Sequence, residues 1–416
     1  MRFLYGARVR AGRAKRAGPR GAKSRDPATH GDPANHGDLA NRGDLAADSP
    51  RWAKLVLVIG SVLAVLSGLF VVGSKALDAY LSGSVKHEAL LTGDLAPQGK
   101  SIAGPLNILL LGMDERTNNT DYIRTDSIII VHVNANHDSV SLVSLPRDAR
   151  AEVPAFPATE FAGGFAKLGE AFSLANRTRD ANGGWVGDPT TAGRQRGVEL
   201  LVRTINGLVP GGLPFNAVAI INHAGFRRLV EAMGGVYMCI DERVVSDHYD
   251  RNGRYVDVTV ERGIPGYVYE RGCRTLKAWE ALDYVRQRKH LELGDGDYGR
   301  QRHQQQFLYA VFKQLLSRKT LTDVGKFNEL RAAAGELLTL DLGGVSVIDW
   351  IYSFRGLDTS DVTLIKTNGG KYATRVIGNT DYEELTGESL DLLKAVQSDQ
   401  VYDFVVRHPE WVAEPG

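Results

Sequence analysis

Acidic side chains stand where apolar runs of this chain begin or end. Asp114 follows the apolar run Ile108–Leu111, and Asp126 precedes the run Ile128–Val131. In a fold built on a β-sheet, strand ends are where side chains converge on a ligand. Carboxylate oxygens suit hard divalent cations, so Asp114 and Asp126 are candidate ligands of Mg²⁺, with Mn²⁺ as an alternative. The competing interpretation is that both acids cap turns or pair with nearby arginines.

Two arginines flank the same strand ends. Arg124 stands two residues before Asp126, and Arg147 precedes Asp148 at the end of a third apolar run. A planar guanidinium binds phosphate oxygens in bidentate fashion, which the ammonium of lysine does not. These residues therefore predict a phosphate site, unless the arginines are solvated or pair with Asp126 and Asp148.

A second group of polar residues surrounds one glycine-rich turn between Tyr284 and Gln306. Several arginines in a chain of near-zero net charge indicate a concentrated anion site, and the alternative is an exposed basic surface. Arg300 and Gln304 are four residues apart and would share one face of the following helix. The group consists of Arg286, Arg288, Arg300, Arg302 and Gln304.

Short β-branched runs predict the strands that must position these groups, and helical apolar spacing predicts helices between them. The first strands follow one another through short turns, which favours antiparallel neighbours, whereas later strands alternate with helices. We therefore expect an α/β fold with a mixed sheet covered by helices on both faces. The Gly- and Ala-rich stretch Ala158–Gly197 predicts a mobile loop over the site. Expected strands are Ile108–Leu111, Ser127–Val133, Ser139–Ser144, Ala217–Ile221, Val236–Ile240 and Val362–Ile365; expected helices are Val198–Gly207, Gly225–Met233, Leu276–Tyr284 and Gln301–Leu316.

Composition excludes several classes of protein. The 416 residues are 43% hydrophobic and 24% charged, which is typical of a globular protein with ample core. A net charge of +1 and the absence of a helix-turn-helix pattern argue against nucleic acid as a partner. The histidines show no metal-ligand spacing such as HExxH. Cys239 and Cys273, the only cysteines, could form one disulfide if the domain is exported.

The N-terminal region predicts a membrane anchor. Residues 1–54 form a basic, low-complexity tail without a core. Residues 55–75 contain the uncharged run Leu55–Gly73, which is long enough to cross a bilayer as a helix; the alternative is a cleaved signal peptide. The preceding basic residues place the tail in the cytoplasm by the positive-inside rule. We expect a single-pass membrane protein with a linker over 76–104 and an extracellular domain over 105–416.

Six segments, in order, resemble the LytR-CpsA-Psr family of cell-wall enzymes: NILLLGMD, RTDSIIIV, SLPRD, AMGGV, ALDYVRQR and DYGRQRHQQQFL. The resemblance implies an α/β/α sandwich with a mixed central sheet and a pocket for a polyprenyl-linked (pyro)phosphate. It also implies a Mg²⁺-dependent phosphotransferase that moves a glycopolymer from this lipid carrier onto peptidoglycan, at the 6-hydroxyl of muramic acid.

The resemblance assigns roles residue by residue. One departure is His303, where many members have arginine, and Arg302 beside it is expected to compensate. Cys239 and Cys273 resemble a pair found in actinobacterial members, which implies a disulfide. The implied metal ligands are Asp114 and Asp126, the implied catalytic residues are Asp126, Asp148, Arg124 and Arg288, and the implied substrate-binding residues are Arg147, Arg286, Arg300, Arg302 and Gln304.

Two choices stay open at the level of sequence. The acceptor hydroxyl needs a base or an orienting carboxylate, and either Asp126 or Asp148 could serve. The same site could instead belong to a phosphohydrolase that splits polyprenyl pyrophosphate with water. A non-catalytic sensor of polyprenyl phosphate, or a transcriptional attenuator, is the other alternative.

Overall fold

The computed structural model describes residues 86–97, 99, 102–114, 123–256, 260–315 and 338–415. The predicted basic tail (1–54), the predicted membrane span (55–75) and most of the predicted linker lie outside these residues. Within the described ranges, none of the helices has both the length and the apolar character that crossing a membrane requires.

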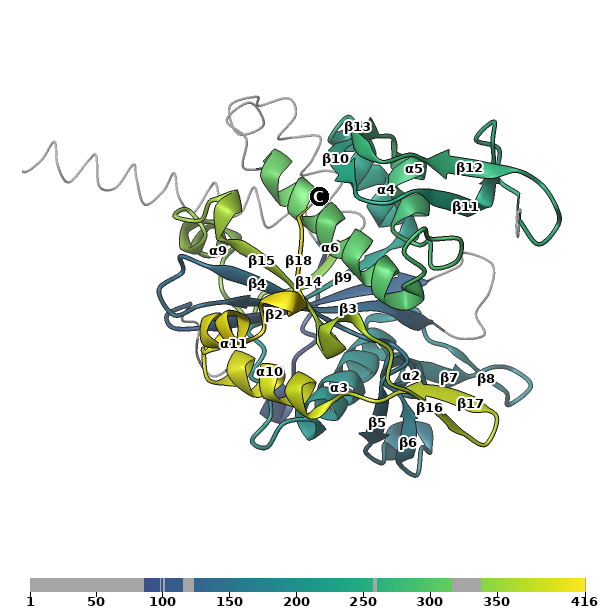
Figure 1. Cartoon of the computed structure of the whole chain (residues 1–416). Coiled ribbons are helices and arrows are strands. Elements are labelled where there is room, and N and C mark those ends of the chain that lie inside the picture. The colour runs from purple at the N-terminus through teal and green to yellow at the C-terminus, as the bar shows by residue number, and fades with distance from the viewer. Residues whose placement is uncertain are drawn as a thin grey trace, which may run out of the picture. The chain divides into compact units, whose positions relative to one another are not determined.

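An eight-stranded mixed sheet forms the centre of the fold (Figure 1). Its order is β1-β14-β9-β2-β3-β4-β15-β18. The strands β2, β3 and β4 are antiparallel neighbours, as predicted, whereas β2 pairs with β9 and β4 pairs with β15 in parallel. The bounds are β1 Lys86–His87, β2 Leu106–Asp114, β3 Arg124–Val133, β4 Val140–Leu145, β9 Ala217–Asn222, β14 Leu338–Asp341, β15 Val362–Lys366 and β18 Val412–Ala413.

Helices cover both faces of this sheet because its strands are apolar on both sides. Alternate residues of β2, such as Leu109 and Leu111, join a core with α2, α3, α10 and α11. Leu110 lies on the opposite face, where α6 and α9 pack. All six residues of β4 are buried, which fits a strand in the middle of a sandwich. The helices are α2 Leu168–Ala175, α3 Thr191–Gly207, α6 Gly296–Leu315, α9 Val347–Ser353, α10 Gly387–Gln397 and α11 Val401–Arg407.

A smaller lobe with its own apolar core lies beside the sheet. Four short strands and two helices surround this core, and α6 contributes Phe307, Ala310 and Val311 to it. The lobe contains the disulfide between Cys239 and Cys273, which confirms the predicted pairing. Its elements are α4 His223–Ala232, β10 Val236–Ile240, β11 Val244–Asp250, β12 Gly266–Tyr269, β13 Gly272–Leu276 and α5 Ala278–Tyr284.

The predicted mobile loop over Ala158–Gly197 is wrong. Within it, α2 is buried against the sheet, and small hairpins flank this helix. Its glycines allow close packing: a Cβ on Gly197 would lie 2.7 Å from the ring of Phe172. The remaining strands are β5 Arg150–Val153, β6 Gly164–Lys167, β7 Arg177–Arg179, β8 Trp185–Gly187, β16 Thr374–Ile377 and β17 Thr380–Glu383; short 3₁₀ helices lie at Gly93–Leu95, Pro157–Thr159, Thr359–Asp361, Thr367–Gly370 and Pro409–Trp411.

Candidate active site

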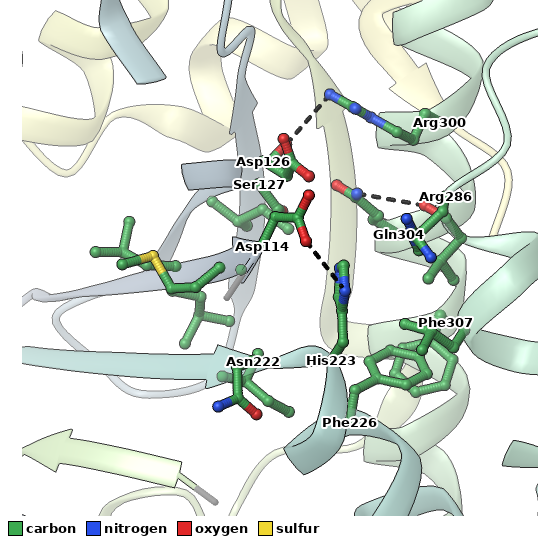
Figure 2. A pocket seen from close by; sticks show the side chains of 18 of the residues that line it. Asp114, Asp126, Ser127, Asn222, His223, Phe226, Arg286, Arg300, Gln304 and Phe307 are labelled. Atoms are coloured by element: carbon green, nitrogen blue, oxygen red, sulfur yellow. Dashed lines mark hydrogen bonds and ion pairs between the residues drawn. The ribbon is translucent and has the colours of Figure 1, made fainter. Parts of the chain in front are cut away.

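A cavity of about 630 Å³ lies between the central sheet and the smaller lobe. Charged side chains gather at one end of it, and the stacked rings of Phe226 and Phe307 lie at the other (Figure 2). Eight residues predicted from the sequence line this one cavity. They are Asp114, Arg124, Asp126, Arg147, Arg286, Arg288, Arg300 and Gln304.

A β-bulge brings the two predicted metal ligands to the same cavity. In the β2–β3 pair, Gly112 is opposite Ser127 and Met113 is opposite Thr125, so Asp126 is an extra residue without a partner in β2. A bulge of this kind re-aims a side chain, and bulges are common beside active sites. Asp126 therefore lines the cavity together with Asp114 (Figure 2). In a regular strand, by contrast, successive side chains point to opposite faces of the sheet.

Two arginines hold Asp126 in its ionised form. Arg147 Nη1 donates to Asp126 Oδ1, and Arg300 Nη2 donates to the backbone carbonyl of Asp126 at 3.2 Å. Burial alone would raise the pKa of Asp126, but the charges of Arg300 and Arg147 outweigh it, and the pKa lies below its usual value. Arg300 is buried, and its Nη2 also contacts Asp297 Oδ1 at 2.6 Å. The charged end of the cavity thus contains a preformed cluster of opposite charges.

One stripe along α6 follows the cavity from its charged end to its apolar end. Residues at i, i+4, i+7, i+8 and i+11 of an α-helix lie on one face. Gln305 lies off this stripe and fixes the helix to the sheet, because its Nε2 donates to Ser144 Oγ at 2.8 Å and to the Leu142 carbonyl at 3.1 Å. The stripe that lines the cavity is Arg300, Gln304, Phe307, Leu308 and Val311.

Arg286 and Arg288 enter the cavity from the turn that follows α5. The residue between them, Gln287, is only 1% exposed and accepts a hydrogen bond from the Asp247 backbone. Gln304 Nε2 donates to the Val285 carbonyl at 3.3 Å, so α6 is tied to the same turn. The predicted sharing of one helix face by Arg300 and Gln304 is confirmed.

Two predicted site residues do not line the cavity. Arg302 stands about 200° around the helix from Arg300, and it pairs with Glu242, Asp295 and Asp241 instead. Asp148 forms ion pairs with Lys167 at 3.0 Å and with Arg147 at 3.6 Å. The expected compensation by Arg302 for His303 is therefore wrong, since both belong to one internal network with Glu242.

The sequence prediction missed two histidines of the cavity wall. His223, the first residue of α4, lies with its Nδ1 3.4 Å from Asp114 Oδ1. His248 on β11 lines the cavity beside Gln287. The position of His223 directly after a buried strand is a signal that could have found it. His248 has no such signal, because its contacts come from residues far away in the chain.

Comparison with known proteins identifies the family. The model of the LytR_cpsA_psr family matches residues 75–398. The chain belongs to the LytR-CpsA-Psr family. It is 25% identical over 389 residues to the cell wall biosynthesis protein LcpA of Corynebacterium glutamicum, covering 89% of this chain and 68% of that protein. It is 27% identical over 301 residues to a polyisoprenyl-teichoic acid–peptidoglycan teichoic acid transferase TagU of Halalkalibacterium halodurans, covering 70% and 80% respectively.

Solved structures share the fold. B. subtilis TagV matches with a TM-score of 0.50 at 19% identity, over 73% of this chain and 99% of that one. Protein gbs0355 from Streptococcus agalactiae matches with a TM-score of 0.52 at 19% identity, over 72% and 88%. The α/β architecture and its mixed sheet are therefore those of LytR-CpsA-Psr structures.

The donor set of this LytR-CpsA-Psr protein fits the magnesium ion that the family resemblance implied. Asp114 and Asp126 offer carboxylate oxygens in one cavity, and the lowered pKa of Asp126 keeps it in the form that binds a cation. Among the described residues, two other clusters could hold a metal ion, because their ligand atoms lie close together. They are Asp241, Glu242 and His303 in one and Asp247, Glu261 and His290 in the other. Of the residues in these two groups only Asp247 lines the cavity, so we assign no metal to either group.

Proposed function

We propose that this protein is a phosphotransferase that moves a glycopolymer from a polyprenyl-(pyro)phosphate carrier onto peptidoglycan. One observation carries the proposal: a single cavity joins a cation-rich end to an apolar end, along one face of α6. A lipid-linked phosphate has this same division between a charged head and a hydrocarbon tail.

The charged end suits phosphate. Six arginines and lysines line the cavity against three aspartates, so the wall has an excess of positive charge. Guanidinium groups on separate elements, such as Arg147 on one side and Arg286 and Arg288 on another, can contact different phosphate oxygens. Arg300 is largely buried, and in such surroundings its charge stabilises an anion more strongly than in water.

The apolar end suits a prenyl chain. The stacked pair of Phe226 and Phe307, with ring centroids 4.4 Å apart, forms part of the apolar wall of the cavity. Burying prenyl carbon there contributes about 25 cal/mol for each Å² removed from water. Further apolar lining residues are Leu110, Ile129, Leu229, Leu282, Val285 and Val311.

This arrangement supports the following reaction. The acceptor hydroxyl oxygen forms a bond to the phosphorus that carries the polymer, and the phosphorus–oxygen bond to the lipid phosphate breaks. The hydroxyl proton passes to a base, and the lipid phosphate leaves as an anion facing the arginines. Asp114 and Asp126 would hold Mg²⁺, which when bound neutralises phosphate charge. Arg288 and Arg124 would orient the phosphate and stabilise the negative charge that develops on it.

The names of the relatives support peptidoglycan as acceptor, with the 6-hydroxyl of muramic acid as the proposed position. TagU is named a transferase of teichoic acid to peptidoglycan, and LcpA a cell wall biosynthesis protein. The Cys239–Cys273 disulfide suits an oxidising compartment. We place the domain outside the membrane, anchored by residues 55–75, where carrier and cell wall meet.

The test compares wild type with Asp126→Ala and Arg288→Ala, using full-length protein in detergent. Release of lipid phosphate and formation of a covalent polymer–peptidoglycan product are measured together. Each variant should lose transfer by about 100-fold or more, because Asp126→Ala removes a proposed ligand of the cation and Arg288→Ala removes a guanidinium that stabilises phosphate charge. Arg254→Ala, at a side chain 81% exposed outside the cavity wall, is the matched control. Wild-type rates in both site variants would disprove the assignment.

The same assay separates the alternative functions. A phosphohydrolase would release lipid phosphate at the same rate with and without peptidoglycan, and would form no covalent product. A non-catalytic sensor would bind the lipid without turnover.

A further inference from the structure

A hydrogen-bonded histidine, aspartate and tyrosine form part of the cavity wall. His248 Nδ1 lies 3.0 Å from Asp283 Oδ1, and Tyr269 Oη donates to Asp283 Oδ2 at 2.8 Å. Asp283 and Tyr269 are 2% and 1% exposed, whereas the His248 side chain is 22% exposed and lines the cavity. The histidine is thus the one end of this chain of groups that a substrate can reach.

The network fixes the tautomer of His248. Asp283 accepts hydrogen bonds also from Gln287 Nε2 at 2.7 Å, so it acts as an acceptor on both of its oxygens. Burial and the charge of Asp283 raise the pKa of Tyr269, which therefore stays a donor. The Gln287 amide nitrogen also lies 3.0 Å from His248 Nδ1, but its two protons are donated to Asp283 Oδ1 and to the Asp283 carbonyl. Nδ1 of His248 therefore donates its proton to Asp283, and Nε2 presents a lone pair. A histidine oriented in this way by a carboxylate is prepared to accept a proton.

The carboxylates predicted as the base are poorly suited to that role. Asp126 contacts Arg147, and the arginine charges lower its pKa, which weakens it as a proton acceptor. Asp148 does not line the cavity and pairs with Lys167. Neither of these two carboxylates is therefore a well-placed base for the acceptor hydroxyl.

We propose that His248 is a catalytic residue that accepts the proton of the acceptor hydroxyl, with Asp283 and Tyr269 as positioning residues. This inference rests on the proposed transferase function. The acceptor O–H gives its proton to Nε2 as its oxygen bonds to phosphorus and the lipid phosphate leaves with the electrons of the broken bond. Gln287, which contacts His248, stands between Arg286 and Arg288 in the cavity wall. A phosphate bound by these arginines would therefore lie close to the proposed base.

The decisive experiment measures the pH dependence of transfer for His248→Gln. The imidazole contacts the Asp283 carboxylate and the Gln287 amide. The charged groups of the cavity wall on the neighbouring elements are Asp247, Arg286, Arg288 and Lys289. Loss of a general base should lower kcat by about 100-fold with KM for the lipid substrate unchanged. The decline of the wild-type rate toward acid pH, where an imidazole base becomes protonated, should disappear. His87→Gln, on exposed edge strand β1, is the matched control.

Two further variants guard against a trivial loss of structure. His248→Ala should regain activity on addition of imidazole, and Asp283→Asn should lower kcat while melting of the protein stays two-state. A folded His248→Gln protein with wild-type kcat and an unchanged acid limb would overturn the inference, as would the absence of imidazole rescue. If the wild type transfers polymer and His248→Gln does so equally well, the role of His248 is rejected but the proposed transferase function stands. If the wild type itself transfers no polymer, the proposed function is rejected.

Discussion

Arg300 and Arg302 show how two residues of one motif differ in role. Arg300 faces the cavity, and Arg302 is surrounded by Asp241, Glu242 and Asp295. We predict that Arg302→Met destabilises folding by about 3 to 5 kcal/mol, since it leaves buried acids without their partner. Urea unfolding measures this difference, with Arg254→Met as the exposed control. Unchanged stability together with lost affinity for polyprenyl phosphate would instead place Arg302 in the site.

The ionisation of Glu88 should make the stability of the fold depend on pH. Burial disfavours its charge, yet hydrogen bonds from Arg194, Lys86 and Thr191 outweigh burial and lower the pKa of Glu88 to about 2. A depressed pKa contributes stability above the unfolded value near 4.5, and this contribution is lost as pH falls toward 2. Glu88→Gln should therefore cost roughly 3 kcal/mol at neutral pH and almost nothing near pH 2.

Acid unfolding curves of Glu88→Gln and of the exposed control Glu152→Gln check this prediction. A stability difference from wild type that stays constant between pH 5 and about 2 would contradict it.

For individual residues, the sequence predicted which side chains carry charge near the site but not the direction in which each points. Asp114 and Arg300 were found because they stand at strand and helix ends. Asp148 and Arg302 also stand near the end of a strand or helix, but their ion pairs with Lys167 and Glu242 turn them away from the cavity. His248 and Asp283 are 35 residues apart, so their contact has no local signature.

At the scale of elements, α2 supports the strand ends that carry the site. Gly169 N donates to the Arg147 carbonyl at 2.8 Å, and Thr125 Oγ1 donates to the Gly169 carbonyl at 3.0 Å. A Cβ on Gly169 would lie 2.8 Å from the Thr125 carbonyl oxygen. We predict that Gly169→Ala destabilises the fold by about 1 to 3 kcal/mol. It should also lower transfer activity, because the helix would move away from Arg147.

Gly207→Ala is the matched control for this substitution. Gly207 ends α3, and an added Cβ there meets nothing within 4 Å. Denaturation and transfer assays on both variants check the prediction. Equal behaviour of the two variants would show that α2 does not support the site.

The elements with strong periodicity were predicted well, and those defined by packing were not. The expected run Val236–Ile240 is β10, and the expected helix Leu276–Tyr284 contains α5. The helix α2 was missed because its glycines and alanines, which indicate a loop by composition, serve here for close contact. Edge strands β1 and β18 have two residues each, too few for an alternating pattern.

Across the protein, the candidate site lies between two of the three apolar cores that the described residues form, namely the core of the lobe and the core on the sheet face that α6 covers. The sheet supplies Asp114 and Asp126, while the lobe supplies Arg286, Arg288 and His248. The helix α6 belongs to both cores, since Phe307 packs in the lobe and Leu308 packs on the sheet. The reaction therefore depends on the lobe keeping its shape against the sheet.

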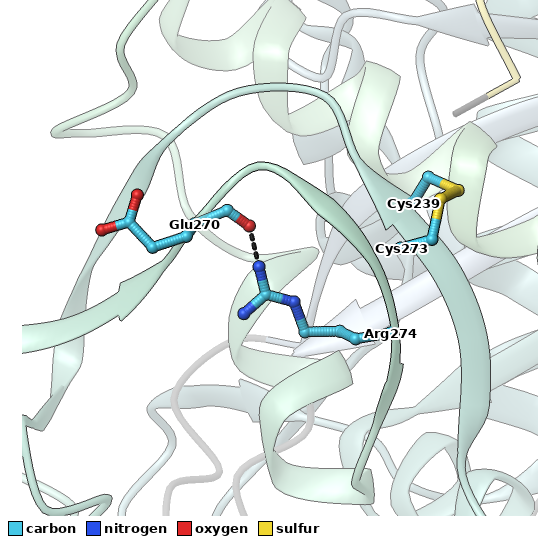
Figure 3. The surroundings of a disulfide bond; sticks show 4 residues. All are labelled: Cys239, Glu270, Cys273 and Arg274. Carbon is cyan, nitrogen blue, oxygen red and sulfur yellow. Dashed lines mark hydrogen bonds between the residues drawn. A yellow bond between two sulfur atoms is a disulfide. The ribbon is translucent and has the colours of Figure 1, made fainter.

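The disulfide is the covalent support of that lobe. Cys239 and Cys273 are opposite each other on the antiparallel strands β10 and β13 (Figure 3). The neighbouring turn has a further contact, in which Arg274 donates to the Glu270 carbonyl. Because β13 leads directly into α5, loosening this pair should also loosen the turn that holds Arg286.

We predict that the double variant Cys239→Ser/Cys273→Ser loses about 2 to 4 kcal/mol of stability. Hydrogen exchange should accelerate in β10, β13 and α5 and stay unchanged in β2–β4, because the sheet has its own core. Affinity for a polyprenyl phosphate should fall in parallel, since the lobe forms one wall of the cavity. Reduced wild-type protein should behave like the variant, and uniform exchange across lobe and sheet would instead mean that the two cores unfold as one unit.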